Sequence, residues 1–294
     1  MKMNVQEIEL LKLHDALFDE KEVPVSVLRL DEIHPYISGN KWFKLKYNIE
    51  EFFRLKKKCL VTFGGAFSNH IIATAAAGKE FGIETIGIIR GDELNEDSNA
   101  ALKFASGCGM KLFFVSRDEY RRMRDIQHLP EFICNELSIT NDEIYFLPEG
   151  GSNALSVKGC AEIVKLIPPD TDFVCCACGT GTTLAGISTA LNENQKVIGI
   201  SVLHGEEFLE KDILELNGNK KSFQLIHEYS FGGYAKSNAE LEMFCKMFYE
   251  RHHLEIEPVY TGKLFLGLYD LVNKIFFKKG SKITALHTGG VHAF

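Results

Sequence analysis

Long apolar runs are missing from this sequence of 294 residues. No stretch approaches the ~18 consecutive apolar residues that a transmembrane helix needs. Residues 1–13 mix Lys and Glu with Leu and Ile, and they lack the basic start and continuous apolar centre of a signal peptide. We therefore expect a cytoplasmic protein that does not enter a membrane.

An excess of positive charge is also missing. Lys and Arg number 33 against 40 Asp and Glu, which gives a formal net charge of −7. Nucleic-acid-binding proteins usually present basic surfaces to the phosphate backbone. The short basic cluster at residues 54–58 follows an amphipathic stretch, and we interpret it as a solvated helix end. We expect no nucleic-acid partner.

The spacing that marks zinc fingers is absent, although the chain has eight cysteines. Cys175, Cys176 and Cys178 share one apolar run, and no second pair of Cys or His follows at the required distance. We interpret them as reduced thiols in a cytosolic core, and we expect no metal site.

Short β-branched runs alternate with helical stretches along the chain, which predicts an α/β fold with parallel-rich sheets flanked by helices. Ligands bind such sheets at the carboxyl ends of the strands, where residues 64–70, 178–183 and 287–290 form unusual loops. Strands are expected at 59–63, 83–90, 111–115, 144–147, 172–177, 196–203 and 282–286. Helices are expected at 69–81, 99–106, 118–137, 157–166, 182–191, 239–252 and 264–277.

The first candidate site is the segment C-G-T-G-T-T at residues 178–183, which follows a predicted strand and opens a predicted helix. Glycines let the backbone approach an anion, and the helix start offers N–H groups and a favourable dipole. The threonine hydroxyls add donors. No G-K-[ST] follows, so this is not a nucleotide P-loop. The segment predicts a phosphate cradle, with a threonine-capped turn as the alternative.

The second candidate is the segment S-G-N-K-W-F-K-L-K-Y at residues 38–47. On a helix, Lys41 and Lys44 share one face, whereas Lys46 lies elsewhere. A lysine forms an imine readily when burial or a neighbouring cation lowers its pKa, and Lys44 could be that cation. The alternative is a solvated basic start of a helix.

The third candidate is F-G-G-A-F-S-N-H at residues 63–70. Two glycines end a strand, and Ser68 and Asn69 begin an Ala-rich helix. Ser68 is a good N-cap, which is its simplest role. The other interpretation is a small-anion site in which Ser68 and the helix amides bind a carboxylate. His70 alone is more typical of a packed histidine than of a catalyst.

Three further segments complete the set: E-G-G-S-N at 149–153, V-Y-T-G-K at 259–263 and H-T-G-G at 287–290. In chain order, these segments resemble the family of 1-aminocyclopropane-1-carboxylate (ACC) deaminase and D-cysteine desulfhydrase, pyridoxal phosphate (PLP) enzymes of the tryptophan-synthase fold type. The resemblance spans about residues 28–290. It implies a tryptophan-synthase β-subunit-like fold and a homodimer. It also implies a larger domain of residues 1–47 and 160–294, a smaller domain of residues 48–159, and PLP between them.

The resemblance also assigns residues to the cofactor. Lys41 would form the Schiff base with PLP and then remove the α-proton of the substrate. Lys44 would lie near the cofactor phosphate, Asn69 would bind the phenolic oxygen, and Thr288 would meet the pyridine nitrogen, with Thr261 beside the active-site tyrosine Tyr260. The phosphate would be cradled by Gly179, Thr180, Gly181, Thr182 and Thr183.

Further residues are assigned to the substrate. Ser68, Asn69 and His70 would face its carboxylate or the moving proton, and Tyr234 and Tyr260 resemble the active-site tyrosines of the family. ACC deaminases carry Glu at the position of Thr261 and Gln at that of His70. Both departures favour a D-cysteine desulfhydrase, which converts D-cysteine to pyruvate, sulfide and ammonia.

Two alternatives remain open. One is an ACC deaminase, which releases 2-oxobutanoate and ammonia from ACC. The other is a PLP-binding protein without useful turnover, because Phe43 and Ile72 stand where family members often carry Arg.

Overall fold

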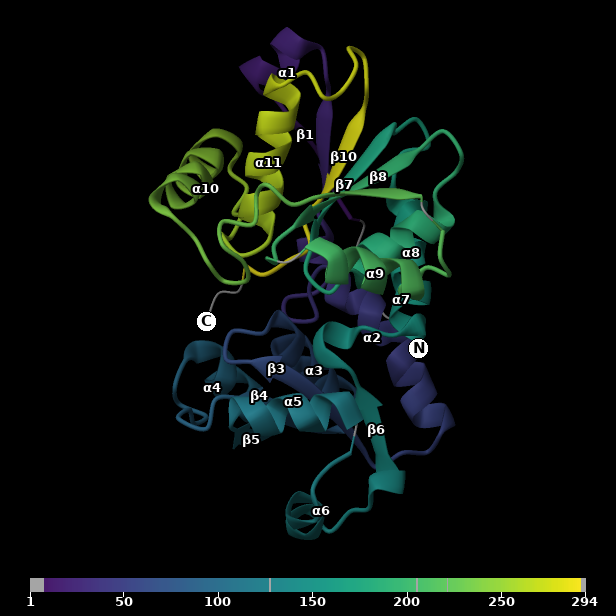
Figure 1. Cartoon of the computed structure of the whole chain (residues 1–294), viewed down its shortest axis with the longest axis vertical. Coiled ribbons are helices and arrows are strands. Elements are labelled where there is room, and N and C mark those ends of the chain that lie inside the picture. Colours follow the sequence, from purple (N-terminus) through teal and green to yellow (C-terminus); the bar gives the residue numbers. More distant parts are fainter. Residues whose placement is uncertain (1–7, 127, 205, 221, 292–294) are drawn as a thin grey trace. The chain divides into compact units, whose positions relative to one another are not determined.

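The computed structural model describes residues 8–291 apart from 127, 205 and 221. The chain divides into two compact units, each with its own sheet (Figure 1). The smaller unit comprises Lys44–Ser156, and the larger comprises residues 8–43 together with Val157–Val291. The ends of the predicted larger domain, residues 1–7 and 292–294, lie outside the described residues.

Both divisions fall inside helices. The first lies in α2 (Asn40–Arg54), so that residues 40–43 belong to the larger unit and the rest of the helix to the smaller. The second lies in α7 (Ala154–Ala161), which continues as the 3-10 helix η4 (Glu162–Leu166). The helix predicted at 157–166 therefore begins earlier and changes its hydrogen-bonding pattern.

The smaller unit contains a four-stranded sheet in the order β5-β4-β3-β6, and all of its neighbouring strands are parallel. Its strands are β3 (Cys59–Gly65), β4 (Glu84–Arg90), β5 (Lys111–Val115) and β6 (Ile144–Leu147). These four strands were expected from the sequence, and the sheet confirms their parallel pairing.

Helices cover both faces of this sheet, because alternate strand residues point to opposite sides. Phe63 and Ile88 pack with Tyr120, whereas Ile89 packs with Ile71 on the other face. The helices are α3 (Asn69–Phe81), α4 (Ala100–Gly107), α5 (Arg117–Ile126) and α6 (Glu131–Leu137). Short 3-10 turns, η2 (Asn141–Glu143) and η3 (Glu149–Gly151), flank β6.

The single helix expected at 118–137 is wrong, since the segment forms α5 and α6 with a break between them. Pro130 stands at the N-cap of α6; it has no N–H to donate and disfavours a helical residue before it. Leu129 is fully buried, and its N–H donates to the side chain of Asn141 at 2.9 Å. Burial of Leu129 and the proline thus end the first helix.

The larger unit contains a six-stranded sheet in the order β1-β2-β10-β7-β8-β9. β1 and β2 are antiparallel and the other neighbours are parallel, which confirms a parallel-rich α/β fold. The strands are β1 (Leu10–Leu13), β2 (Val25–Leu28), β7 (Phe173–Cys178), β8 (Lys196–Ser201), β9 (Phe223–Ile226) and β10 (Ile283–Leu286).

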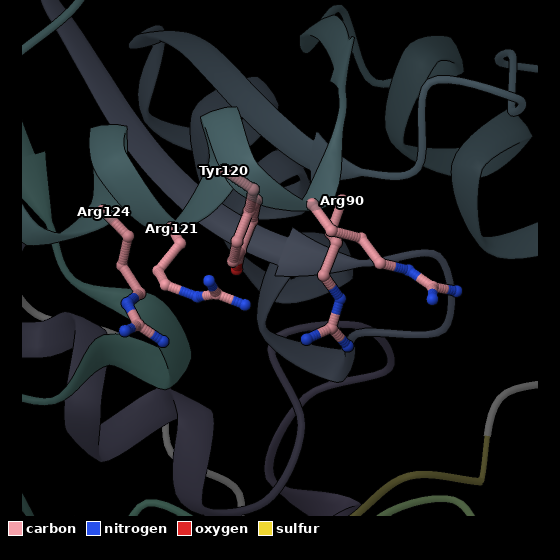
Figure 2. A pocket seen from close by; sticks show the side chains of 5 residues that line it. Arg90, Tyr120, Arg121 and Arg124 are labelled. Atoms are coloured by element: carbon pink, nitrogen blue, oxygen red, sulfur yellow. The ribbon is translucent and has the colours of Figure 1, made fainter.

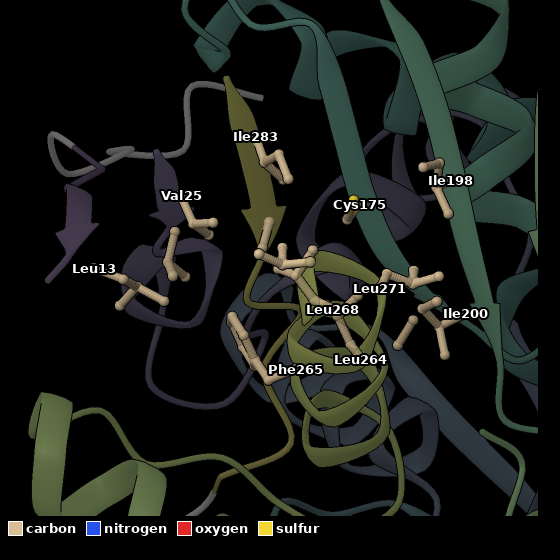
Figure 3. Close-up of a cluster of buried hydrophobic side chains, with 14 of the residues drawn as sticks. Leu13, Val25, Cys175, Ile198, Ile200, Leu264, Phe265, Leu268, Leu271 and Ile283 are labelled. Atoms are coloured by element: carbon tan, nitrogen blue, oxygen red, sulfur yellow. The ribbon is translucent and has the colours of Figure 1, made fainter. Parts of the chain in front are cut away.

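Opposite faces of this sheet carry different helices. Cys175 and Ile198 pack with Leu264 and Leu268 of α11, as Figure 3 shows. A Cβ on Gly199 would meet Leu184 of α8 at 2.7 Å, so α8 covers the other face. The helices of this unit are α1 (Ala16–Lys21), η1 (Leu30–Ile33), α8 (Thr182–Ala190), α9 (Glu206–Leu216), α10 (Ala239–His252) and α11 (Thr261–Asn273).

All eight cysteines are free thiols, and six of them are buried, which confirms the interpretation as core residues. Burial raises the pKa of Cys175 to about 12, so this thiol stays protonated at neutral pH. Among the described residues, no helix combines the length and the apolar character that crossing a membrane requires.

Candidate cofactor and substrate site

The turn between β7 and α8 leaves the start of a helix without a side-chain cap. Gly181 is the N-cap residue, with a φ of 76° that favours glycine, and no described side chain caps α8 there. A Cβ on Gly181 would also clash with Ile213. The hydroxyls of Thr180 and Thr182 lie 3.1 Å apart, beside the backbone N–H groups that begin α8. Amides and hydroxyls together form an anion-binding cradle.

Lys41 lies one residue after the start of α2 and is linked to this cradle by a single side chain. Its Nζ donates to Asn40 Oδ1 at 2.9 Å, and Asn40 Nδ2 donates to Thr183 Oγ1 at 2.8 Å. Asn40 is buried, so its bond to Thr183 is shielded from water, whereas its bond to Lys41 is only partly buried. The structure therefore brings the predicted nucleophile and the predicted phosphate cradle together.

The loop before Lys41 packs against the turn that carries Thr288. Gly39 has a φ of 63°, and a Cβ there would clash with the carbonyl oxygen of Thr288. Only glycine lets the two backbones approach so closely. Thr288 is 9% exposed, and its hydroxyl forms no hydrogen bond within the part of the chain that the structure describes. A hydroxyl without a protein partner on a largely buried residue is available to a ligand.

The two predicted tyrosines lie together beside the cradle. A Cβ on Gly179 would be 3.1 Å from Cε1 of Tyr260, and the rings of Tyr260 and Tyr234 meet edge to face at 5.9 Å. The loop of Tyr234 is held by Lys263, whose Nζ donates to the carbonyls of Ser230 at 2.8 Å and Gly233 at 2.7 Å. Lys263 is fully buried, and burial lowers its pKa.

Thr261, predicted to contact the cofactor, uses its hydroxyl inside the start of α11. Thr261 Oγ1 accepts the N–H of Glu257 at 2.9 Å and lies 3.2 Å from Glu257 Oε1. The same carboxylate accepts the N–H groups of Val259, Tyr260 and Thr261 at 2.7–2.9 Å. Burial raises the pKa of Glu257, whereas these amides act in the opposite direction.

In the smaller unit, the E-G-G turn joins Lys44 and His70. Lys44 is buried, and its Nζ donates to the carbonyl of Gly150 at 2.9 Å. A Cβ on Gly151 would be 3.1 Å from Cε1 of His70 and 3.7 Å from Cβ of Lys44. These three segments, distant in the sequence, therefore form one corner of the unit.

The tautomer of His70 follows from its neighbour Thr62. The Thr62 hydroxyl donates its proton to the carbonyl of Leu147 at 2.9 Å, so it can only accept from His70 Nε2, which lies 2.8 Å away. Nε2 must then carry the proton. A neutral His70 therefore has an acceptor lone pair on Nδ1, on the side of the ring that faces Gly151.

Ser68 is the N-cap of α3, as its simplest interpretation requires. Its Oγ accepts the N–H of Ile71 at 3.4 Å, which is long for such a bond. Asn69 follows as the first residue of α3, and its side chain forms no hydrogen bond to any described residue. Both side chains are half-buried.

The pyridoxal-phosphate dependent enzyme family has a sequence model that matches residues 8–289. This chain belongs to that family.

Its relatives agree with the resemblance found in the motifs. A putative ACC deaminase from Pyrococcus horikoshii is 32% identical over 270 residues, covering 87% of this chain and 81% of the relative. A mitochondrial bifunctional D-cysteine desulfhydrase/ACC deaminase from Arabidopsis thaliana is 29% identical over 283 residues, covering 87% and 69%. The crystal structure of an ACC deaminase homologue superimposes with a TM-score of 0.82 and 27% identity, covering 99% of this chain and 91% of that one. The chain is thus a PLP-dependent enzyme of the lyase and deaminase group with the tryptophan-synthase-like fold.

The larger unit of this PLP enzyme offers a partner for each reactive part of the cofactor. The amine of Lys41 suits the aldehyde, the uncapped start of α8 suits the phosphate, and the Thr288 hydroxyl suits the ring nitrogen. The residues therefore fit PLP.

Four residues with clear roles in this geometry were not predicted from the sequence. Asn40 and Lys263 stand inside quoted motifs, so their positions were visible but their hydrogen bonds were not. Thr62 and Glu257 carry no local signal, because each acts on a residue that only the fold brings near.

Proposed function

We propose that this PLP enzyme catalyses α,β-elimination on a small β-substituted amino acid, with D-cysteine as the first candidate. The observation that carries the proposal is the bridge from Lys41 through Asn40 to Thr183. It joins an amine that can hold an aldehyde to a cradle that can hold a phosphate.

Each residue of the cradle contributes binding. The amides at the start of α8 and the hydroxyls of Thr180 and Thr182 bind the phosphate. Thr288 would meet the ring nitrogen as a neutral hydroxyl, which would leave the ring less positive than a carboxylate partner would. Bound PLP supplies an electron sink for negative charge at the carbon that bears the amino group. A weaker sink suits prompt loss of a β-substituent.

Proton movement is assigned to Lys41 and the tyrosines. Lys41 Nζ accepts the α-proton, and Asn40 Oδ1 orients the amine by accepting one of its hydrogens. The hydroxyls of Tyr260 and Tyr234 are the candidates for delivering a proton to the departing β-substituent. Ser68 and His70 remain the predicted contacts of the substrate carboxylate.

The direct test measures pyruvate and sulfide released from D-cysteine by the purified protein supplied with PLP. Lys41→Ala should abolish both the visible absorbance of bound PLP and the release of products. Lys46→Ala, a lysine on the same helix outside the assigned site, is the matched control. A wild-type protein that stays colourless with added PLP would overturn the proposal.

ACC is the second candidate substrate, and the relatives named as ACC deaminases favour it. The residue at position 261 is the argument against it, because Thr261 stands where ACC deaminases carry Glu. Faster release of 2-oxobutanoate from ACC than of pyruvate from D-cysteine would reverse the order of the candidates.

A Thr261→Glu variant alone is a poor probe of this choice. The new carboxylate would meet that of Glu257, whose Oε1 lies 3.2 Å from Thr261 Oγ1. Two like charges at such a distance destabilise the fold. The double variant Thr261→Glu/Glu257→Gln removes this repulsion, and it should be compared with Glu257→Gln alone.

A further inference from the structure

Four arginines from two elements of the smaller unit line one pocket. Arg90 ends β4, and the other three lie at positions i, i+4 and i+7 of α5, so they share one face of that helix. The pocket has a volume of about 320 Å³. It is lined by Arg90, Arg117, Tyr120, Arg121 and Arg124. In Figure 2 the guanidinium ends of the labelled arginines lie on the same side as the hydroxyl of Tyr120.

The charges of these arginines are only partly balanced. Arg124 contacts Asp125 at 2.8 Å and Glu149 at 3.5 Å. Arg121 reaches Asp118 only at 3.6 Å. Arg90 and Arg117 form no ion pair within residues 8–291 as described, although Arg90 lies over the ring of Tyr120 at 5.7 Å.

Tyr120 also lines this pocket, on the same helix as three of the arginines. It is 2% exposed, and its hydroxyl is buried without a hydrogen-bond partner in the described part of the chain. Burial and the neighbouring carboxylate of Glu149 raise the pKa of Tyr120, so the hydroxyl stays a donor at neutral pH. Buried hydroxyls normally find an acceptor. An acceptor bound by the arginines would lie beside this residue, and a small shift of the ring would let the hydroxyl donate to it.

The arginine chemistry specifies the kind of acceptor. A guanidinium donates two parallel hydrogen bonds to one oxyanion, which suits phosphate and carboxylate. Several cations gathered in one place repel each other, and a multiply charged anion removes that repulsion. We propose that this pocket binds a phosphate-type oxyanion of a small molecule.

The pocket adjoins both segments of the smaller unit that carry predicted substrate residues. Arg90 Nη2 lies 3.5 Å from the place of a Cβ on Gly65, whose carbonyl accepts the N–H of Ser68 at 3.1 Å. Glu149, which contacts Arg124, begins the turn that packs on His70. The oxyanion can therefore come from two sources: a separate small molecule, or a phosphorylated β-substituent of the substrate. Only the second source rests on the proposed function.

Binding is tested by titrating inorganic phosphate into the PLP-loaded, borohydride-reduced enzyme, with calorimetry as the readout. Reduction fixes PLP in the cradle, so the cradle cannot take up the added phosphate. Arg90→Gln/Arg117→Gln should weaken binding by about a hundredfold, since each charge-assisted hydrogen bond contributes about tenfold. Arg122→Gln, a neighbour on α5 that does not line the pocket, is the control for loss of one positive charge nearby.

Tyr120→Phe tests the hydroxyl separately. It keeps the ring in the core and should weaken phosphate binding about fivefold, with no loss of thermal stability. Equal binding by the wild type and the double arginine variant overturns the proposal. So does equal weakening in Arg122→Gln, which would reduce the effect to general charge.

The two sources are separated by kinetics with O-phospho-D-serine and D-cysteine. If the substrate supplies the oxyanion, the double arginine variant should lower kcat/KM for O-phospho-D-serine about a hundredfold and leave that for D-cysteine unchanged. If a separate molecule supplies it, both substrates should respond alike. Should Lys41 carry no PLP, turnover with both substrates would be absent, while the loss of phosphate binding in the arginine variants would persist.

Discussion

Helices α8 and α11 begin beside the same turn of the larger unit, but their first backbone amides have different partners. At α11, Glu257 holds the entering chain: its carboxylate accepts the N–H groups of Val259, Tyr260 and Thr261, and its carbonyl accepts that of Gly262. At α8, the N-cap is Gly181, which has no side chain to accept any. A helix start whose amides lack a side-chain partner can accept an anion in its place.

Helix α3 in the smaller unit is intermediate between the two. Ser68 caps it, yet the bond from Ile71 N is 3.4 Å long. Such a weak cap can be exchanged for a ligand oxygen more easily than the Glu257 contacts before α11. Four variants test this difference between the helix starts.

Lys41→Ala should have the largest effect, because it removes the amine beside the ligand-binding helix start. We expect turnover to fall about a thousandfold or more, as for loss of a general base. The measurement is pyruvate release at saturating D-cysteine, together with mass spectrometry of the borohydride-reduced protein. A pyridoxyl group found on a different lysine would contradict the assignment.

Gly181→Ala should break the cradle itself. A residue with a Cβ is strained at a φ of 76°, and the new atom would clash with Ile213. Strain and overpacking together should cost about 3 kcal/mol of unfolding free energy, and PLP affinity should fall with it.

Gly218→Ala is the matched control for this variant. Gly218 has a φ of 72°, but a Cβ there would meet no atom within 4 Å. We expect a cost of about 1 kcal/mol from the backbone alone and unchanged PLP affinity. Denaturant unfolding and fluorescence titration with PLP measure the two quantities. Equal losses in both variants would argue against a special role for Gly181.

Glu257→Gln should separate stability from cofactor binding at α11. The neutral amide accepts fewer of the N–H groups that the carboxylate holds, so we expect a loss of about 2 kcal/mol in unfolding free energy. PLP affinity should change less than in Gly181→Ala. A larger loss of PLP affinity than of stability would make α11 part of the cofactor site.

Ser68→Ala should have the smallest effect on stability. A long cap bond should cost about 0.5 kcal/mol, whereas Asn238→Ala at α10, whose cap bond to Leu241 N is 2.9 Å, should cost about 1 kcal/mol. If Ser68 binds the substrate carboxylate, only Ser68→Ala should raise KM, by about tenfold. An unchanged KM would leave Ser68 with its capping role alone.

The sequence predicted the buried parallel strands well, because their apolar runs and flanking turns are distinct. β5 and β6 begin and end at the expected residues, as does α10. β1, β2 and β9 were missed; β1 and β9 are the edge strands of their sheet, and each buries only one of its four residues. The helix α9 was missed as well.

The site was predicted as residues rather than as contacts. Lys41 and Gly179 of the cradle are 138 residues apart in the sequence. The glycines and threonines of residues 178–183 identified the cradle as a candidate site. The side chain that joins them, Asn40, reads as a turn residue until the fold brings it to Thr183. No sequence motif marks the arginine pocket, because Arg90 and α5 come close only when β4 pairs with β5, the strand before α5.

The protonated thiols of the core can report when each sheet opens. An alkylating reagent attacks the thiolate, and burial raises the pKa of Cys59 in the smaller sheet to about 11 and that of Cys175 in the larger to about 12. Each should therefore be modified only while its own sheet is open. The modification rates of the two cysteine-containing peptides would therefore measure the opening of each unit separately, with no substitution in the chain.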